Sequence, residues 1–275
     1  MYKILEKTQF SEKVFKFRIE APAIAKHAHA GQFLMVRANE TGERVPFTLA
    51  GWNGDEGWVE FIFMVIGKTT EMLSTYEAGE SLRDVVGPLG VPTEMAEGPC
   101  AVIGGGVGLA IAFPVAKHLV ETGHEVHAIM GARTKDLLLM EDQFRELLDE
   151  DHIHITTDDG SYGEQGVVTA PLERLLQDKA VSQVFCVGPV PMMKFSTLTA
   201  QKYDTPITAS LNPIMVDGTG MCGGCRVTVG GEMKFGPDCD ATLVDWDDLR
   251  ARQAAYRSEE GESLKAYEEK SCACH

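Results

Sequence analysis

The sequence predicts a β-barrel domain, then an α/β domain with a parallel sheet, then a small module rich in glycine and cysteine. Three patterns predict this order. Short β-type runs separated by glycines fill residues 1–97, strand-type and helix-type runs alternate over 98–208, and three cysteines lie among glycines in 209–245. A charged tail at 246–275 is expected to be helical. A chain of 275 residues is long enough for about two cores.

Composition and charge exclude several classes of protein. The chain carries 25 Lys and Arg against 41 Asp and Glu, a formal net charge of −16, whereas nucleic acids and anionic membranes attract clustered positive charge. Residues 1–10 lack the apolar run of a signal peptide, and glycines and a proline interrupt the uncharged stretch 98–116. We therefore expect a cytoplasmic protein without a membrane span, whose seven cysteines are reduced and available as metal ligands.

The individual elements follow from residue type and spacing. Runs rich in β-branched and aromatic residues predict barrel strands at 14–19, 32–37 and 58–66. One helix is expected beside them at 71–76, with Thr69 or Thr70 as its cap. In the second domain, strands are expected at 101–103, 125–130, 152–156 and 184–187, and helices at 109–121, 137–148, 171–176 and 192–203. This alternation predicts a parallel sheet with crossover helices.

A glycine loop lies between the first strand and the first helix of the second domain, with glycines at 104, 105, 106 and 108. Such a loop lets the backbone approach a diphosphate, which the free N–H groups of the helix start would bind. The strict G-x-G-x-x-G spacing is not met, because Leu109 holds its last position. A tight turn that packs helix on sheet is the alternative. Arg133, after the next strand, could accept a 2′-phosphate or lie along a ribose, so NAD(H) and NADP(H) both stay open.

A second candidate site is the run Asp217-x4-Cys222-x2-Cys225, followed by Cys239. This is the spacing of plant-type [2Fe–2S] ligands with Asp in place of the first Cys. The surrounding glycines supply N–H groups that can donate to sulfur and tune a cluster. A zinc site made of the same three Cys and one Asp is the rival interpretation, and unligated thiols are another.

These motifs resemble a known family. Over residues 1 to about 250 the chain is similar to the small NAD(H)-binding subunit of NADH-dependent ferredoxin:NADP oxidoreductase, also described as a sulfide dehydrogenase subunit. It is also similar to the electron-transfer subunit of dihydroorotate dehydrogenase. Both belong to the ferredoxin–NADP reductase superfamily, so the resemblance implies that fold. Its most specific part is 215–229, where the family also uses Asp as a ligand.

The resemblance implies FAD as a cofactor. Its motif on a barrel strand is formed here by Arg44, Pro46, Phe47 and Thr48. Arg44 would neutralise the diphosphate and Thr48 would hydrogen-bond the flavin. A second motif would hold the diphosphate with N–H groups at a helix start and includes Val65, Gly67, Thr69 and Thr70. Taken singly, each motif could be an ordinary strand or cap. Gly188 and Pro189 resemble the late motif near the nicotinamide, and Cys186 beside them is expected to be a buried strand thiol.

The chain departs from the family after the cysteine pair. Family members carry a further Cys soon after Lys-Phe, whereas Lys234-Phe235 is followed directly by Gly236-Pro237-Asp238-Cys239 here. Either Cys239 is the fourth ligand through a reshaped loop, or the cluster is altered or lost. The chain ends in Cys272-Ala-Cys274-His275, which is expected to be a frayed tail, with a ligand donated to a partner as the lesser alternative.

The function expected from the resemblance is that of an electron-transfer subunit, which passes electrons between NAD(P)H, FAD, a [2Fe–2S] cluster and a larger partner. The partner would carry its own flavin and [4Fe–4S] clusters and host ferredoxin or NADP(H) chemistry, with electron bifurcation as an option. No general acid–base pair is seen, and hydride transfer requires none. One alternative is a dihydroorotate dehydrogenase electron-transfer subunit, which Asp217 in place of Cys argues against. Another is a non-catalytic scaffold with zinc at 217–239.

Overall fold

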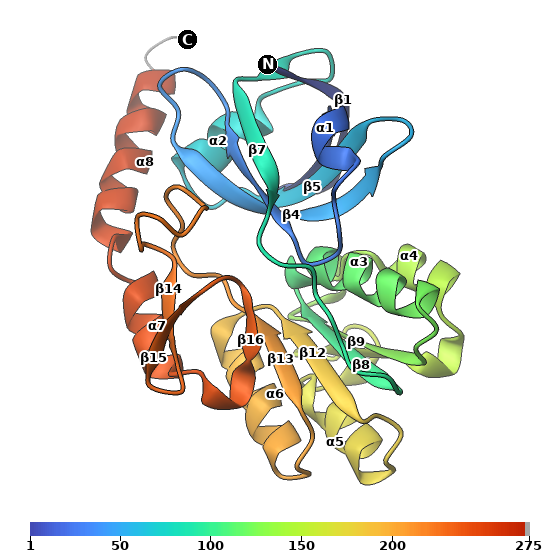
Figure 1. Cartoon of the computed structure of the whole chain (residues 1–275). Coiled ribbons are helices and arrows are strands. Elements are labelled where there is room, and N and C mark those ends of the chain that lie inside the picture. Colours follow the sequence, from blue (N-terminus) through green and yellow to red (C-terminus); the bar gives the residue numbers. More distant parts are fainter. Residues whose placement is uncertain (273–275) are drawn as a thin grey trace.

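The computed structural model describes residues 1–272 and contains two large sheets, one above the other in Figure 1. The first sheet is antiparallel throughout, in the order β6-β1-β2-β5-β4-β3-β7, and curls into a near-closed barrel. Its strands are β1 (Tyr2–Ser11), β2 (Val14–Glu20), β3 (Phe33–Arg37), β4 (Arg44–Asn53), β5 (Trp58–Met64), β6 (Ser81–Leu82) and β7 (Asp84–Leu89). Two short helices accompany them, α1 (Pro22–Ala25) and α2 (Lys68–Ser74).

Aromatic side chains fill the barrel. Phe17, Phe61 and Phe63 are at most 2% exposed and pack edge to face or tilted, with ring centroids 5.1 to 6.1 Å apart. Phe47 stacks on Phe61 with centroids 4.9 Å apart. Period-2 alternation along β2 and β5 directs these rings inward, so the aromatic runs of the sequence become one core.

The second sheet has the order β11-β10-β9-β8-β12-β13-β16 and is parallel except for β16. Its strands are β8 (Cys100–Gly105), β9 (Val126–Ala132), β10 (Ile153–Thr157), β11 (Glu164–Gln165), β12 (Gln183–Val187), β13 (Ile207–Ser210) and β16 (Asp238–Asp240). Helices α3 (Gly108–Glu121) and α4 (Glu141–Leu147) pack on one face, and α5 (Thr169–Gln177) and α6 (Val190–Gln201) on the other.

The prediction of one helix over 137–148 is confirmed only for its later part. The chain forms a short 3-10 turn, η1 (Lys135–Leu137), and begins α4 only at Glu141. Met140 between them has φ +63°, a left-handed conformation that cannot continue a helix. The other 3-10 turns are η2 (Glu150–His152) and η3 (Ala241–Leu243).

The C-terminal part of the chain returns to both layers. A hairpin of β14 (Arg226–Val229) and β15 (Glu232–Phe235) precedes β16, and α7 (Trp246–Gln253) packs on β14. Helix α8 (Arg257–Cys272) then runs up beside the barrel and contacts α2 (Figure 1). Cys274 and His275 lie outside the described residues. No helix in residues 1–272 is both long enough and apolar enough to cross a membrane.

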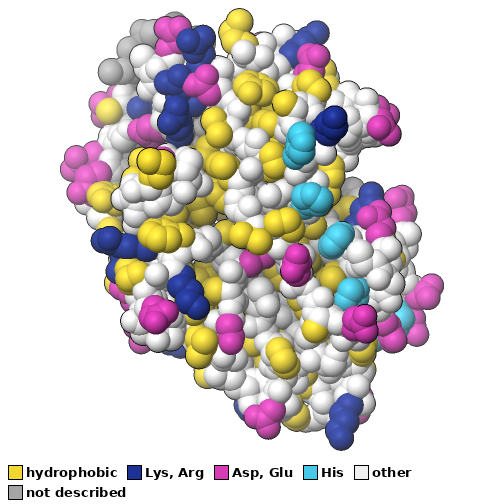
Figure 2. Space-filling model, viewed as in Figure 1, with side chains coloured by type: hydrophobic (Ala, Val, Ile, Leu, Met, Phe, Trp, Pro, Cys, Tyr) yellow, Lys and Arg dark blue, Asp and Glu magenta, His cyan; other side chains and the backbone are white. Residues whose placement is uncertain are grey.

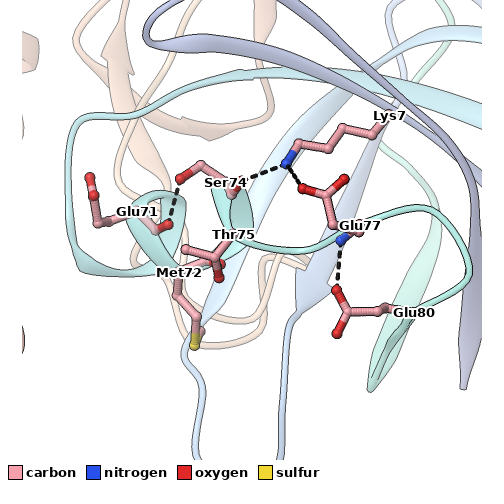
Figure 3. Close-up of polar contacts among 7 residues, drawn as sticks. All are labelled: Lys7, Glu71, Met72, Ser74, Thr75, Glu77 and Glu80. Carbon is pink, nitrogen blue, oxygen red and sulfur yellow. Dashed lines mark hydrogen bonds and ion pairs between the residues drawn. The ribbon is translucent and has the colours of Figure 1, made fainter. Parts of the chain in front are cut away.

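Helix α2 is held against β1 by polar contacts at its C-terminal end (Figure 3). The Lys7 ammonium donates to the Ser74 carbonyl oxygen at 2.8 Å and to the Glu77 carboxylate at 2.7 Å. A cation placed on the terminal carbonyl of a helix satisfies an unpaired acceptor and complements the helix dipole. Lys7 therefore holds the C-terminal end of α2 against β1.

Helix α3 approaches the sheet through two glycines. A Cβ added at Gly104 would lie 2.7 Å from the Leu109 side chain, and one at Gly108 would lie 2.4 Å from the Val187 carbonyl oxygen. Both distances are below any real carbon contact, and the second partner is backbone. Only glycine at 108 therefore lets the start of α3 rest on β12.

We predict that Gly108→Ala lowers the free energy of unfolding by about 1–3 kcal/mol, because the methyl group must displace α3 or β12. Urea denaturation checks this. Gly261→Ala in α8 is the matched control, since no atom lies within 4 Å of its added Cβ, and it should be neutral or stabilising by up to about 1 kcal/mol. Equal effects of the two changes would contradict the packing role.

We also predict that Lys7→Met lowers the free energy of unfolding by about 1 kcal/mol, through loss of the carbonyl contact and the ion pair at the end of α2. Thermal unfolding in low and high salt measures it. Lys3→Met, on the same strand and exposed, is the control. If the Lys3 variant loses as much stability, Lys7 has no special role in placing α2.

Candidate functional site

The topology of the second sheet marks a ligand site. The chain runs from β8 outward through β9 and β10, then crosses to β12 and β13 on the other side of β8. The carboxyl ends of β8 and β12 therefore flank the point where strand order reverses, and such points form binding crevices in α/β proteins. The glycine loop at 104–108 follows β8, and Gly188-Pro189 follows β12. Both predicted nucleotide motifs thus meet at this crevice, where Val187 pairs with Gly104.

The glycines of the crevice divide by environment. A Cβ at Gly105 would lie 2.4 Å from the Met192 sulfur, and one at Gly188 would lie 3.2 Å from the backbone nitrogen of Gly105. These two keep the loops in contact with each other and with α6. Gly106 differs, because it has φ +56° and nothing within 4 Å of an added Cβ. The glycines of the loop therefore have two roles. Most of them allow helix and sheet to pack closely, whereas Gly106 leaves its backbone open to a ligand.

The start of α3 offers unpaired backbone donors beside Gly106. Val107 precedes the helix and no side chain caps it. No acidic residue lies in the first turn, and the helix is 14 residues long. The N–H groups of a helix start are oriented outward and carry partial positive charge, so they suit an anionic group. Arg133 is exposed just beyond β9, where its carbonyl oxygen accepts from the Asp159 N–H at 3.3 Å.

On the barrel, strand β4 separates its motif residues by face. Phe47 points into the aromatic core, so its expected contact with a ligand is not supported by its position. Pro46 and Thr48 alternate with Phe47 and lie on the opposite face, and Arg44 is exposed at the strand start. Helix α3 packs on the later part of the same strand. Ala50, two residues beyond Thr48 on that strand, and Val107 of the glycine loop both pack against the core that α3 helps to form.

The second flavin motif begins α2 and is built by Thr70. Its hydroxyl oxygen accepts from the N–H groups of Ile66 and Gly67 at 3.0 and 3.1 Å, so the expected capping threonine acts from within the first turn. Thr69 and Thr70 are buried. Two of the N–H groups expected to bind a diphosphate are thus already paired. The donors left at this helix start belong to Lys68 and Thr69, beside the open space at Gly67.

The cysteine loop is organised around Asp217. Its carboxylate accepts from the N–H groups of Thr219 and Cys222, both at 2.9 Å, and these bonds hold the pKa of the carboxyl below its usual range. The Gly224 N–H lies 3.4 Å from the Cys222 sulfur, in the donor position that cluster sulfurs use. Asp217, Cys222 and Cys225 therefore offer one carboxylate and two thiols from one loop, donor types that iron–sulfur clusters and zinc use. The three ligand atoms do not all lie within 4.8 Å of one another in this structure, so the loop would have to close to bind one metal ion.

Cys239 does not join this loop. It lies on β16, whose pairing sets it opposite Ala209 of β13, and its side chain packs against the core of the α/β sheet beside Cys186. Burial raises the pKa of the Cys239 thiol to about 12. Asp238, the preceding residue, points to the other face of the strand, as period-2 alternation requires. The expectation that Cys239 ligates with Cys222 and Cys225 finds no support in this placement. Cys186 is fully buried, as expected.

Asp238 is a residue of the site that sequence analysis missed. It lines a cavity of about 190 Å³ together with Phe33, Gly218, Cys225 and other residues where the barrel, the cysteine loop and β16 meet. One carboxylate oxygen accepts from the Thr93 hydroxyl at 2.5 Å, while the other, Oδ1, is buried without a hydrogen-bond partner among residues 1–272. Burial raises the pKa of this carboxyl.

The three histidines at 127, 152 and 154 also come together. They lie at the amino ends of β9 and β10, and it is the register of these two strands that brings the rings together. Burial and nearby rings lower the pKa of His127 and of His154, the latter to about 4. This edge of the sheet is opposite to the crevice of β8 and β12.

Asp238→Asn tests the buried carboxyl. Because its pKa is raised in the folded protein, the unfolded chain loses that proton first, and the wild type becomes less stable as pH rises above about 3.8. The amide keeps an acceptor for Thr93 and carries no charge. We expect the variant to gain stability relative to wild type between pH 4 and 7, measured by urea unfolding at each pH. A difference independent of pH would contradict a raised pKa.

Comparison with known proteins identifies relatives of this chain. The family model described as the oxidoreductase NAD-binding domain matches residues 102–197. A Thermotoga maritima protein described as a dihydroorotate dehydrogenase B (NAD(+)) electron transfer subunit homolog is 46% identical over 269 residues, 96% of this chain and 94% of that one. The dihydroorotate dehydrogenase B (NAD(+)) electron transfer subunit of Desulforamulus reducens is 32% identical over 233 residues, 82% of this chain and 87% of that one.

Solved structures show the same relationship and the same fold. A chain from the NADH-dependent reduced ferredoxin-NADP oxidoreductase, solved in a study of flavin-based electron bifurcation, has a TM-score of 0.90 at 45% identity and covers 97% of this chain and 98% of its own. A cytochrome P450 reductase from Amycolatopsis, at 21% identity and a TM-score of 0.60 over 74% of this chain and 65% of its own, shares the fold. The expected barrel and α/β architecture is confirmed. The chain therefore belongs to the family of dihydroorotate dehydrogenase B electron transfer subunits and their homologues, within the ferredoxin–NADP reductase-like superfamily.

Proposed function

We propose that this chain oxidises NADH on a bound FAD and delivers electrons through an iron–sulfur centre to a larger subunit, as in oxidoreductases of the NADH-dependent ferredoxin:NADP type. One observation carries the proposal. Helix α3 packs on both β8 and β4, so the open glycine loop at its start lies beside the barrel strand with the Arg44–Thr48 motif. A hydride donor bound at the loop and an acceptor bound on the strand would be neighbours.

The coenzyme would bind along the crevice at the carboxyl ends of β8 and β12. Open backbone at Gly106 and the uncapped start of α3 would receive the diphosphate, and Gly188 and Pro189 would border the nicotinamide. Arg133 is exposed just after β9 and would border the adenosine ribose of such a ligand. The names of the Thermotoga and Desulforamulus relatives include NAD(+), which favours NADH over NADPH as the coenzyme.

FAD would occupy the outer face of β4. Thr48 would hydrogen-bond the flavin ring, Pro46 would border it, and Arg44 would pair with the diphosphate together with the free N–H groups at the start of α2. When bound, FAD accepts a hydride as two electrons and releases the electrons one at a time. The role of the protein is then to hold nicotinamide and flavin in contact and to exclude water from between them.

The cysteine loop would hold the iron–sulfur centre. Asp217, Cys222 and Cys225 fit three ligand positions, and the backbone N–H on the Cys222 sulfur fits the pattern that tunes such centres. The loop rests on the flavin-bearing barrel, because a Cβ at Gly218 would lie only 2.4 Å from Met35 of β3. Since Cys239 faces the core, the fourth position is assigned to no residue in the part of the chain that the structure describes.

An apolar surface around the loop supports a docking partner. Met221, Val216 and Phe235 are 89%, 60% and 57% exposed next to the cysteines, which is unusual for large apolar side chains. Figure 2 shows hydrophobic side chains across the middle of this face, between the barrel and the second sheet. A larger subunit bound there would cover these side chains and stand close to the metal donors.

A dihydroorotate dehydrogenase partner is the second candidate, favoured by the names of two relatives. Asp217 in the position of the first Cys still argues against it. Purification of the chain with its native partner decides between them. An orotate-forming partner would favour the second candidate, and a partner that reduces ferredoxin or NADP(+) would favour the first.

We predict that Asp217→Ala and Cys225→Ala leave reduction of bound FAD by NADH within about twofold of wild type but abolish electron delivery to the partner complex, because only the onward step uses the loop. Stopped-flow absorbance at the flavin band and turnover with the partner's acceptor measure the two steps separately. Cys239→Ala is the matched control and should leave iron and acid-labile sulfide contents unchanged. If the loop variants lose both steps equally, the proposed separation of roles is wrong. A colourless purified protein containing zinc would instead favour a scaffold.

A further inference from the structure

A group of metal-ligating side chains lies at the amino ends of β9 and β10, far along the sheet from the nucleotide crevice. Glu125 immediately precedes β9, His127 is its second residue, and His152 ends the turn η2 before β10. One ligand atom from each lies within 4.8 Å of the other two. Neither the coenzyme, the flavin nor the cysteine loop uses these residues.

The distances suit a shared ion better than direct pairing. The Nε2 atoms of His127 and His152 each lie 3.7 Å from the same Glu125 oxygen, which is too long for a hydrogen bond. Two ligand atoms bound to one tetrahedral zinc ion at about 2.0–2.1 Å are about 3.3 Å apart. Each nitrogen–oxygen pair is therefore within a few tenths of an ångström of the spacing that one shared ion requires, and all three ligand atoms lie within 4.8 Å of one another.

His154 orients the site from behind. Its Nε2 lies 3.3 Å from Nδ1 of His127, so the two rings share one hydrogen bond. With the proton on Nδ1 of His127, Nε2 of that ring keeps a free lone pair facing Glu125 and His152. A metal-bound histidine normally donates its other N–H to a neighbour that fixes its tautomer and orientation. His154 supplies that neighbour within the protein, and its own ring stacks on His127 at 5.6 Å.

The surroundings leave an entry path to the site. Asp149 and Asp151 form a separate group with His152 and not with Glu125 and His127, so the fourth position is left to solvent. His127 is nearly buried, whereas the Glu125 side chain is 59% exposed, which opens the site to solvent on one side. Two imidazoles with carboxylate select borderline divalent ions such as Zn²⁺ over Mg²⁺ or Ca²⁺, which take all-oxygen sites.

We propose that Glu125, His127 and His152 form a binding site for one divalent transition-metal ion, Zn²⁺ in the first instance, with His154 as the positioning residue. Bound there, the ion ties the turn before β10 to the start of β9 and stabilises that edge of the sheet. The proposal stands apart from the electron-transfer function, because the site shares no residue with the crevice or the cysteine loop.

Zinc titration of the complete, flavin-loaded protein tests the proposal. Isothermal titration calorimetry and metal analysis should show that His127→Gln and His152→Gln each bind one Zn²⁺ fewer than wild type. Glu125→Gln, an exposed change that cannot disturb the core, should weaken that site at least tenfold. His29→Gln, an exposed histidine on the barrel side, is the matched control and should bind as wild type does. Equal stoichiometry in the wild type and all three site variants would overturn the proposal.

X-ray absorption separates this site from the cysteines. The zinc that the variants lose should show only nitrogen and oxygen neighbours at about 2.0–2.1 Å, whereas thiolate-bound zinc shows sulfur at about 2.3 Å. Sulfur neighbours on the lost ion would overturn the assignment. NADH-dependent flavin reduction should be unchanged in the variants, so failure of the zinc site and failure of the electron-transfer proposal are distinguishable.

Discussion

The approach of helix α3 to the ends of β8 and β12 is the contact on which the rest of the structure depends. It requires glycine at 104 and 108, because any side chain there would meet Leu109 or the backbone of Val187. The same helix packs on β4 of the barrel. One helix therefore fixes the spacing between the two sheets, and its free N-terminus stands where the crevice meets the barrel. Under the proposed function a hydride would pass between groups in contact, so this spacing would be a functional constraint as well as a packing one.

A second set of contacts ties the C-terminal part of the chain to the same junction. The cysteine loop rests on β3 through Gly218, and β16 pairs with β13, which brings Asp238 to Thr93 in the connection between the layers. Barrel, α/β sheet and cysteine loop thus meet around one small cavity. This junction brings together three segments that are distant in sequence, and the buried carboxyl of Asp238, which has one unpaired oxygen, lies there.

Much of this architecture could be predicted from the sequence. Buried parallel strands such as 100–105 and 183–187 are short apolar runs, and the aromatic runs of the barrel mark its core strands. Strand β16 could not be predicted, because three residues reading Asp-Cys-Asp carry no strand signal and are held by pairing with β13. That pairing also turns Cys239 toward the core, a fact of register that ligand spacing does not contain. The helix break at Met140 could not be predicted either, because no glycine or proline lies at that position.

The candidate site also contains residues that the sequence could predict and residues that it could not. Motif residues next to each other in sequence, such as the glycine loop, were found together, since a local turn decides their geometry. Residues brought together by strand order were missed, as with Asp238 beside Cys225 and His127 beside His152. Phe47 shows what a motif leaves open, because it names a residue without its face, and alternation along β4 packs this partly buried ring against the barrel core.

The most direct test of this account is reduction of the bound flavin by NADH carrying deuterium at one or the other C4 position. A crevice that holds the nicotinamide against the flavin in one orientation predicts that NADH bleaches the flavin band, and that deuterium slows the reaction at one position only. A protein whose FAD is not reduced by NADH, or whose rate responds equally to both labels, would contradict the claim that α3 sets the two ligands face to face.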